Sequence, residues 1–282
     1  MSERVAPRVL VLEGGGLRGA FVAGALAELQ ESPATAFTHV FATSAGAASA
    51  AYLVTGQIER ALHIWTELTH GGQLISPRHL LRGRGLMDIA GLVEVFQGKH
   101  GLDASRLAAS TTTLRIAVTN CNTGSADHVA ANAQNLFQLL EATMALPVVY
   151  GRVVRVQGVP YIDGGVTDAI PLAPALGLAP EKLVVISTRP LGYRKRPAPW
   201  LTGLLRYNYP SFPAVWPALR DRPESYNRAI TQLEALEREG RLQVIRPRGT
   251  LPASRMTRDR GRILETLDLG RQAARAYLQA QG

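Results

Sequence analysis

Ser44 is the first residue whose type and setting suggest chemistry. It follows the short apolar run 39–42 and precedes an alanine-rich segment, so it stands where a predicted strand turns into a predicted helix. Small neighbours allow such a turn to be sharp, and a sharp turn projects the central side chain outward as a nucleophile. The pattern is the G-x-S-x-G elbow with Ala42 in place of the first glycine. Serine is also a common helix N-cap, and the sequence leaves both interpretations open.

Asp163 is the best candidate for the base that a serine nucleophile needs. The α/β-hydrolase order places a histidine after the acid, but the chain has no histidine beyond His128. Asp163 precedes Gly164 and Gly165, which let the backbone turn sharply and carry the carboxylate into a cleft. With an ordinary pKa of about 3.9, this carboxyl is ionised at neutral pH and can accept the serine proton. The alternative is an ordinary Asp-Gly turn.

A glycine-rich loop, residues 14–19, lies between the first predicted strand and the first predicted helix. Its G-x-G-x-x-G spacing occurs in dinucleotide-binding folds, which also need an acidic residue about 20 residues further on to hold the ribose. No acidic or basic residue lies between Glu31 and Glu59, which counts against a nicotinamide or flavin cofactor. At the head of a helix, the N–H groups of residues 14–16 can instead stabilise a developing oxyanion.

In this order, the glycine loop, Ser44 and the Asp163 turn resemble the motifs of the patatin-like phospholipases. Segment 163–172 also resembles that family's extended motif, with Ala169 where an asparagine is common. The resemblance implies a three-layer α/β/α fold, hydrolysis of lipid acyl esters by a Ser-Asp dyad, and no metal or cofactor. It assigns Ser44 as nucleophile, Asp163 as base, Gly14, Gly15 and Gly16 as the oxyanion hole, and Arg18, Gly19, Gly46, Gly164 and Gly165 as support for the motifs.

The elements that must position these residues alternate between short strands and helices. Apolar runs bounded by turn residues predict buried strands, and apolar residues at helical spacing predict the helices between them. The alternation predicts an α/β sandwich with a mostly parallel central sheet. The predicted strands are 9–12, 39–42, 114–119 and 182–187, the predicted helices are 20–29, 45–53, 58–68, 86–96 and 136–145, and residues 74–85 are predicted to form a loop.

The chain is predicted to divide into a patatin-like catalytic domain, residues 1–189, and a mainly helical C-terminal extension, residues 190–282, packed on that core. Prolines and aromatic residues punctuate the start of the extension, and it resembles the C-terminal extension of one bacterial branch of the family. Two helical segments, 224–240 and 260–281, are predicted on either side of the strand-like segment 242–245.

The net charge of +9 is concentrated in the last third of the chain. Residues 1–188 hold 13 basic and 14 acidic residues, whereas residues 189–282 hold 18 and 8. A basic region of this kind suits contact with an anionic membrane, although it also serves solubility alone. The aromatic stretch from Trp200 to Trp216 is a candidate for that contact, and its alternative is packing on the core. No nucleic-acid-binding motif accompanies the charge, so no nucleic acid is expected as a partner.

Composition narrows the location and the class of protein. A 46% hydrophobic content excludes disorder for the bulk of the 282 residues, and the single Cys121 excludes a disulfide framework. No signal-like segment opens the chain, so we expect a cytoplasmic protein with an option of peripheral membrane contact.

The sequence leaves three functions open. The leading one is a serine acyl hydrolase that acts on lipid or phospholipid esters. The second is a catalytically weak lipid-binding or regulatory protein that retains the fold; Ala42 favours it, and the presence of both Ser44 and Asp163 opposes it. The third is a nucleotide-dependent oxidoreductase, which only the glycine loop favours.

Overall fold

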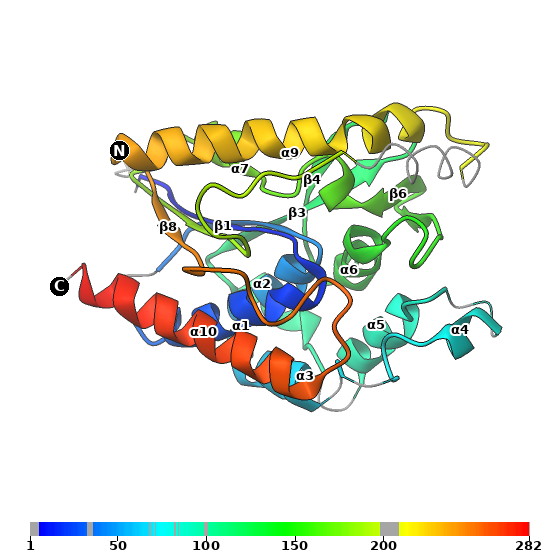
Figure 1. Cartoon of the computed structure of the whole chain (residues 1–282), viewed down its shortest axis with the longest axis horizontal. Coiled ribbons are helices and arrows are strands. Elements are labelled where there is room, and N and C mark those ends of the chain that lie inside the picture. The colour runs from blue at the N-terminus through cyan, green and yellow to red at the C-terminus, as the bar shows by residue number, and fades with distance from the viewer. Residues whose placement is uncertain are drawn as a thin grey trace.

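Within the residues that the computed structural model describes, an eight-stranded sheet lies between two layers of helices (Figure 1). The described residues are 6–32, 36–67, 69–70, 72–81, 83, 85–98, 101–197 and 209–281. The strands are β1 (Arg8–Leu12), β2 (His39–Thr43), β3 (Thr113–Asn120), β4 (Ala126–Ala130), β5 (Val154–Val156), β6 (Val159–Asp163), β7 (Lys182–Ile186) and β8 (Gln243–Ile245). The α-helices are α1 (Gly19–Leu29), α2 (Ala45–Val54), α3 (Ile58–Glu67), α4 (Pro77–Leu81), α5 (Ile89–Gln97), α6 (Leu136–Met144), α7 (Leu172–Leu176), α9 (Val215–Arg238) and α10 (Arg260–Gln279). The 3-10 helices are η1 (Gly16–Arg18), η3 (Ala104–Ala109) and η4 (Gly164–Val166).

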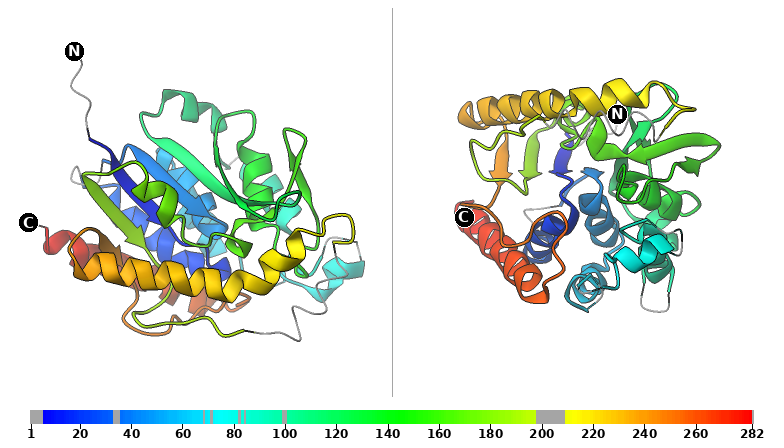
Figure 2. Two further views of the ribbon diagram at one scale, coloured as in Figure 1. Left: turned by 90° about the horizontal axis from the view of Figure 1, so that it is seen from above. Right: turned by 45° about the vertical axis from the view of Figure 1, so that its right-hand side comes forward.

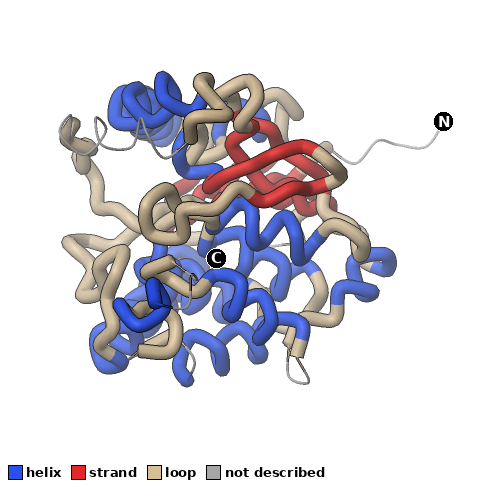
Figure 3. The backbone as a smooth tube through the Cα atoms, turned by 90° about the vertical axis from the view of Figure 1, so that its right-hand side faces the viewer, coloured by secondary structure: helices blue, strands red, loops and turns tan. Residues whose placement is uncertain are grey.

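The sheet has the strand order β5-β6-β3-β2-β1-β7-β8, and β4 pairs with β3 outside this path. Five neighbouring strands run parallel, in the order β3-β2-β1-β7-β8. Strands β4 and β6 pair antiparallel with β3, and β5 pairs antiparallel with β6. Figure 3 shows the strands between helices that lie on both sides of them. The predicted three-layer α/β/α sandwich with a mostly parallel sheet is therefore confirmed.

Strand β1 shows why the sheet needs a helical layer on each face. Its residues alternate between faces, as the pleat of a strand requires. Leu10 and Leu12 pack into the apolar cluster formed with α1, α2 and α10, whereas Val9 and Val11 pack into the cluster formed with α7 and α9. All four side chains are fully buried, so the short apolar run is a strand covered on both sides.

The C-terminal region contributes to every layer. Strand β8 extends the sheet at its edge beside β7, α9 covers one face, and α10 lies against α1 on the other face (Figures 1 and 2). Helices α1 and α10 cross with their backbones in contact. A Cβ atom at Gly24 would lie 1.9 Å from the Leu267 carbonyl oxygen, and one at Gly270 would lie 2.0 Å from that of Phe21. The mainly helical C-terminal region is therefore part of the packed sandwich.

The predicted strands and helices of residues 1–189 are confirmed, with ends that differ by at most three residues. The short strands β4, β5 and β6 and the helices α4 and α7 were not predicted, because brief or polar elements carry little periodicity. Helix α9 begins nine residues earlier than predicted and includes Pro217 and Pro223. Pro217 lies in the first turn, where N–H groups have no acceptor within the helix. Pro223 sits between turns anchored by the buried Leu219 and Tyr226.

The structure bears on the predicted membrane contact in two ways, through the aromatic stretch and through the lengths of the helices. Trp200 and Tyr207 of the aromatic stretch lie outside the described residues. Tyr209 is buried, and with the half-buried Phe212 it packs beside Ile162 in a small apolar cluster, which agrees with packing on the core. Among the helices that the structure describes, none has the length and apolar content needed to cross a bilayer.

Candidate active site

The Ser44 backbone and side chain do not have the geometry of a helix N-cap that bonds the first turn. Ser44 joins β2 to α2 with φ 54° and ψ −130°, a conformation that is strained for a residue other than glycine. Its side chain makes no capping hydrogen bond to α2; instead, Oγ donates to Oδ2 of Asp163 over 3.0 Å. The residue therefore has the geometry of a nucleophile elbow.

Small residues make room for this elbow. A Cβ atom at Gly46 would lie 2.9 Å from the Glu13 carbonyl oxygen, so a larger residue there would force the turn away from β1. At Gly19 a Cβ atom would lie 2.8 Å from that of Ala45. Ala42, by contrast, is fully buried in β2 and accommodated between Leu12 and Ile116 of the neighbouring strands.

Asp163 ends strand β6, and its carboxylate is held on both oxygens. Oδ2 accepts from Ser44, and Oδ1 accepts from the N–H of Gly165 over 2.8 Å. The carboxyl is buried, which raises its pKa above the ordinary value, and the nearby Arg222 guanidinium and these hydrogen bonds act in the opposite direction. Gly164 must be glycine here, because a Cβ atom would lie 2.0 Å from the Ala117 carbonyl oxygen.

Thr143 supports the elbow from α6. The N–H of Ser44 donates to Thr143 Oγ1 over 2.8 Å, and this hydroxyl in turn donates to the Ala117 carbonyl over 2.6 Å. A threonine inside an apolar helix carries no sequence signal for this role. The contact also means that the Ser44 N–H is already satisfied.

The glycine loop presents two free N–H groups. The N–H of Gly14 donates to the Ala169 carbonyl over 3.0 Å, so it is occupied. For the N–H groups of Gly15 and Gly16, the described part of the chain offers no acceptor. Gly16 has φ 57°, and a Cβ atom there would lie 2.6 Å from Arg255. Of the three glycines predicted to form an oxyanion hole, only Gly15 and Gly16 therefore have an N–H group available to donate to an oxyanion.

Two pockets meet at Ser44. The first is apolar, and together with its opening to solvent it contains about 580 Å³ of empty space. Its wall is formed largely by side chains of α2, α3 and α5 and the segments around them, among them Tyr52, Trp65, Met87 and Phe96. The second, together with its opening to solvent, contains about 390 Å³ of empty space. It is lined by the glycine loop, by Ser44 and Asp163, and by cationic side chains.

Arg18 lies in the second pocket. It is buried, its Nε has no hydrogen-bond partner among the described residues, and its pKa is lowered to about 10 by burial and by the nearby Arg189. Arg18 is therefore buried beside the glycine loop and does not lie on the surface. Apart from Asp163, the other charged side chains of this pocket were missed at the sequence level. Glu13 directly precedes the glycine loop but belongs to no recognisable motif, whereas Lys195, Arg222 and Arg255 come from segments remote from any such motif.

Histidine takes no part in this geometry. Among the described residues, no histidine hydrogen-bonds to Ser44 or Asp163; His128 pairs instead with Asp168 over 2.8 Å. The described residues also contain no group of three His, Cys, Asp or Glu side chains arranged to hold a metal ion.

Comparisons with known proteins agree with the motifs. A family model described as patatin-like phospholipase matches residues 10–176, and a model of a domain of unknown function (DUF6363) matches residues 212–282. The uncharacterized protein YjjU of Escherichia coli (strain K12) is 32% identical over 184 residues, which are 64% of this chain. The match spans about half of that relative, 52% of its length. The crystal structure of VipD from Legionella pneumophila superimposes with a TM-score of 0.49 and 15% identity over 96% of this chain and 67% of that chain.

Proposed function

The chain belongs to the patatin-like phospholipase family, and on that premise we propose that it is a serine acyl hydrolase that cleaves carboxylic esters of lipids. The observation that carries the proposal is the 3.0 Å hydrogen bond from Ser44 Oγ to Asp163 Oδ2 on a strained elbow. A strained turn that presents a hydroxyl to a buried carboxylate has no evident structural purpose, whereas it is what an activated nucleophile requires.

In the proposed mechanism, Ser44 Oγ attacks the ester carbonyl carbon while Asp163 takes the serine proton. The carbonyl oxygen becomes an oxyanion, which the free N–H groups of Gly15 and Gly16 stabilise. Collapse of this tetrahedral intermediate breaks the bond to the alcohol, which leaves with the proton from Asp163. Water then attacks the acyl-enzyme, Asp163 takes its proton and returns it to Ser44, and the carboxylic acid departs. One carboxylate therefore serves both half-reactions.

The apolar pocket beside Ser44 fits the acyl chain of such an ester. Its wall is rich in aliphatic and aromatic side chains, and burial of each methylene group contributes about 0.8 kcal/mol. A chain lying there would place its carboxyl carbon next to Ser44 and Gly16, which line this pocket as well as the polar one.

The proposed partners and location follow from the substrate. We propose that the protein works in the cytoplasm and meets its lipid at the surface of an anionic membrane, to which the basic C-terminal region is attracted. Retention of the protein on vesicles that contain anionic lipid, but not on vesicles of neutral lipid, would support this placement.

The primary test compares the wild type with Ser44→Ala and Asp163→Asn on p-nitrophenyl butyrate and on mixed phospholipid vesicles. We expect Ser44→Ala to lose about 10⁴-fold or more in kcat/KM, because the nucleophile is gone. Asp163→Asn should lose about 10²–10⁴-fold, because the amide cannot accept the serine proton. A fluorophosphonate probe should label Ser44 in the wild type only.

Ser211→Ala is the matched control, since Ser211 is exposed and lines neither pocket. It should keep the full activity and labelling of the wild type. If the wild type hydrolyses neither substrate and the probe leaves Ser44 unmodified, the hydrolase proposal fails and the lipid-binding alternative replaces it.

A further inference from the structure

The second pocket at Ser44 holds an excess of positive charge. Two carboxylates, those of Glu13 and Asp163, face four arginines and one lysine, a formal excess of three positive charges when every group is ionised. None of the five cations forms an ion pair with any residue that the structure describes. We call this pocket the basic chamber, and its five cations are Arg18, Arg189, Lys195, Arg222 and Arg255.

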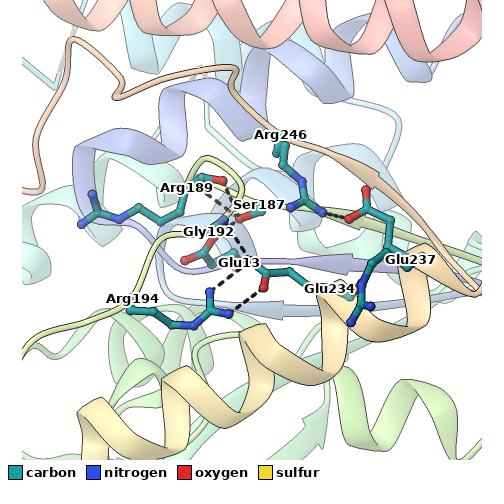
Figure 4. Close-up of polar contacts among 9 residues, drawn as sticks. Glu13, Ser187, Arg189, Gly192, Arg194, Glu234, Glu237 and Arg246 are labelled. Atoms are coloured by element: carbon teal, nitrogen blue, oxygen red, sulfur yellow. Dashed lines mark hydrogen bonds and ion pairs between the residues drawn. The ribbon is translucent and has the colours of Figure 1, made fainter.

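The Glu13 carboxylate does not neutralise these cations by direct contact. Its Oε2 accepts from Ser187 Oγ and from the Thr188 N–H, and its Oε1 accepts from the Tyr226 hydroxyl, each over 2.7 Å. Figure 4 shows the Arg189 guanidinium directed away from Glu13. The Glu13 carboxylate is thus already occupied by neutral donors.

The contacts that the cations do make leave most of their N–H groups available. Arg189 lies over the ring of Tyr193 and Lys195 over that of Tyr226, at 4.0 and 4.1 Å from the ring centres. Arg222 uses its Nε to donate to the Gly165 carbonyl over 2.7 Å. These contacts orient the side chains without neutralising them.

Two other arginines of the C-terminal region do have carboxylate partners. Arg194 makes two hydrogen bonds to Glu234, and Arg246 pairs with Glu237, both with acidic residues of α9 (Figure 4). The arginines of the chamber differ from these two in having no paired carboxylate among the described residues.

The lowered pKa values of two of these groups agree with positive charge that no carboxylate in the chamber compensates. Burial and the neighbouring Arg222 and Arg255 lower the pKa of Lys195 to about 6, against the weaker opposing effect of Glu13. Lys195 is therefore largely neutral at pH 7, and the four arginines and two carboxylates leave a net charge of about +2. Burial and Arg255 lower the pKa of Arg222 to about 10. Holding like charges together in a partly buried site costs folding free energy, and a bound anion would recover it.

We propose that the basic chamber binds the phosphate group of the substrate's headgroup while the acyl chain occupies the apolar pocket. This inference rests on the proposed function and names the substrate class: acyl esters that carry a phosphomonoester, such as phosphatidate. A phosphomonoester bears about −1.5 to −2 charges at pH 7, which matches the excess in the chamber. Guanidinium groups bind phosphate oxygens in pairs, whereas the cationic group of a zwitterionic headgroup would be repelled.

The proposal also assigns a role to the C-terminal region. Four of the five cations come from residues 189–255, and two of these, Arg222 and Arg255, lie within the segment matched by the domain of unknown function. That region would select the headgroup, whereas residues 10–176 would carry the chemistry.

The first experiment measures binding of inorganic phosphate to Ser44→Ala by titration calorimetry at constant ionic strength and pH 7.5. This variant cannot turn over an ester, so the readout does not depend on catalysis. We expect saturable binding at one site and an affinity at least about tenfold weaker after addition of Arg189→Gln and Lys195→Met. Arg262→Gln, which changes an exposed arginine of α10 outside the chamber, should leave the affinity unchanged.

The second experiment compares hydrolysis of phosphatidate, phosphatidylcholine and diacylglycerol with identical acyl chains in the same detergent micelles. The wild type should have the highest kcat/KM for phosphatidate. In the wild-type background, Arg189→Gln with Lys195→Met should reduce the ratio of phosphatidate to diacylglycerol hydrolysis by about tenfold or more. A cooperative thermal transition in each variant confirms that it folds.

The outcomes separate the two proposals. Phosphate binding in the chamber without any ester hydrolysis would overturn the hydrolase function and, with it, the headgroup assignment, and would leave a free-phosphate site. Hydrolysis of diacylglycerol without phosphate binding or preference for phosphatidate would overturn the chamber proposal alone. Phosphate binding together with equal rates on all three lipids would overturn the lipid headgroup as the source of the phosphate.

Discussion

At the scale of single residues, the Ser44–Asp163 pair combines strain with burial. A serine with φ 54° cannot relax into a capping geometry while its Oγ donates to Asp163. The pKa of the carboxyl is set by opposing influences: burial raises it, whereas Arg222, Ser44 and the Gly165 N–H lower it. The result is a base that is more basic than a solvated aspartate.

This balance predicts the acid limb of the pH–activity profile. Asp163 accepts a proton only when ionised, so activity is present above its pKa and is lost as the pH falls through it. Because burial raises this pKa above 3.8, the midpoint of the loss should lie above 3.8. The measurement is kcat/KM for p-nitrophenyl butyrate between pH 3 and 8, accompanied by thermal unfolding to separate inactivation from acid denaturation. A midpoint at or below 3.8 in folded protein would contradict the assigned environment.

At the scale of elements, glycines allow α1 and α10 to touch. Added Cβ atoms at Gly24 and Gly270 would lie within 2.0 Å of carbonyl oxygens of the opposite helix. Helix α1 follows the glycine loop directly, so the C-terminal helix also braces the segment that presents Gly15 and Gly16.

Gly270→Ala should therefore destabilise the protein by about 2 kcal/mol or more, through overpacking of this crossing. Alanine favours a helix interior by about 1 kcal/mol over glycine, so a net loss isolates the steric effect. Chemical denaturation monitored by circular dichroism measures the free energy of unfolding. Gly249→Ala is the control, because an added Cβ there meets no atom within 4 Å. Equal stability of the two variants would show that the helices separate without penalty.

At the scale of the whole molecule, the two predicted regions share one sandwich. Strand β8 completes the sheet, and α9 buries Val9, Val11 and Val185 together with its own Ile230 and Leu233. The division into two domains after residue 189 stays a prediction. The described packing shows that the C-terminal region forms part of the layers of the sandwich.

A chain ending at Arg189 should consequently fail to fold cooperatively. Loss of the C-terminal region would expose one apolar face of the sheet and the unpaired edge of β7, and such a surface is prone to aggregation. Soluble yield and the thermal transition of the truncated and full-length chains provide the comparison. A sharp unfolding transition in the truncated chain would instead establish residues 1–189 as an independent domain.

The sequence by itself determined the local features. Apolar runs specified the central strands, helical spacing specified most helices, and the types and order of residues around Gly14, Ser44 and Asp163 indicated the chemistry. These features were predictable because strand alternation, helix periodicity and the sterics of a tight turn depend on residues that are neighbours in the chain.

Tertiary structure alone decided which groups meet. It joined Ser44 to Asp163 across 119 positions, occupied the Gly14 N–H with Ala169, and supplied Thr143 beneath the elbow. It also gathered Arg222 and Arg255 at the glycine loop. None of these contacts has a local signal, because each depends on the strand order, the register and the packing of helices on both faces of the sheet, which are properties of the whole folded chain.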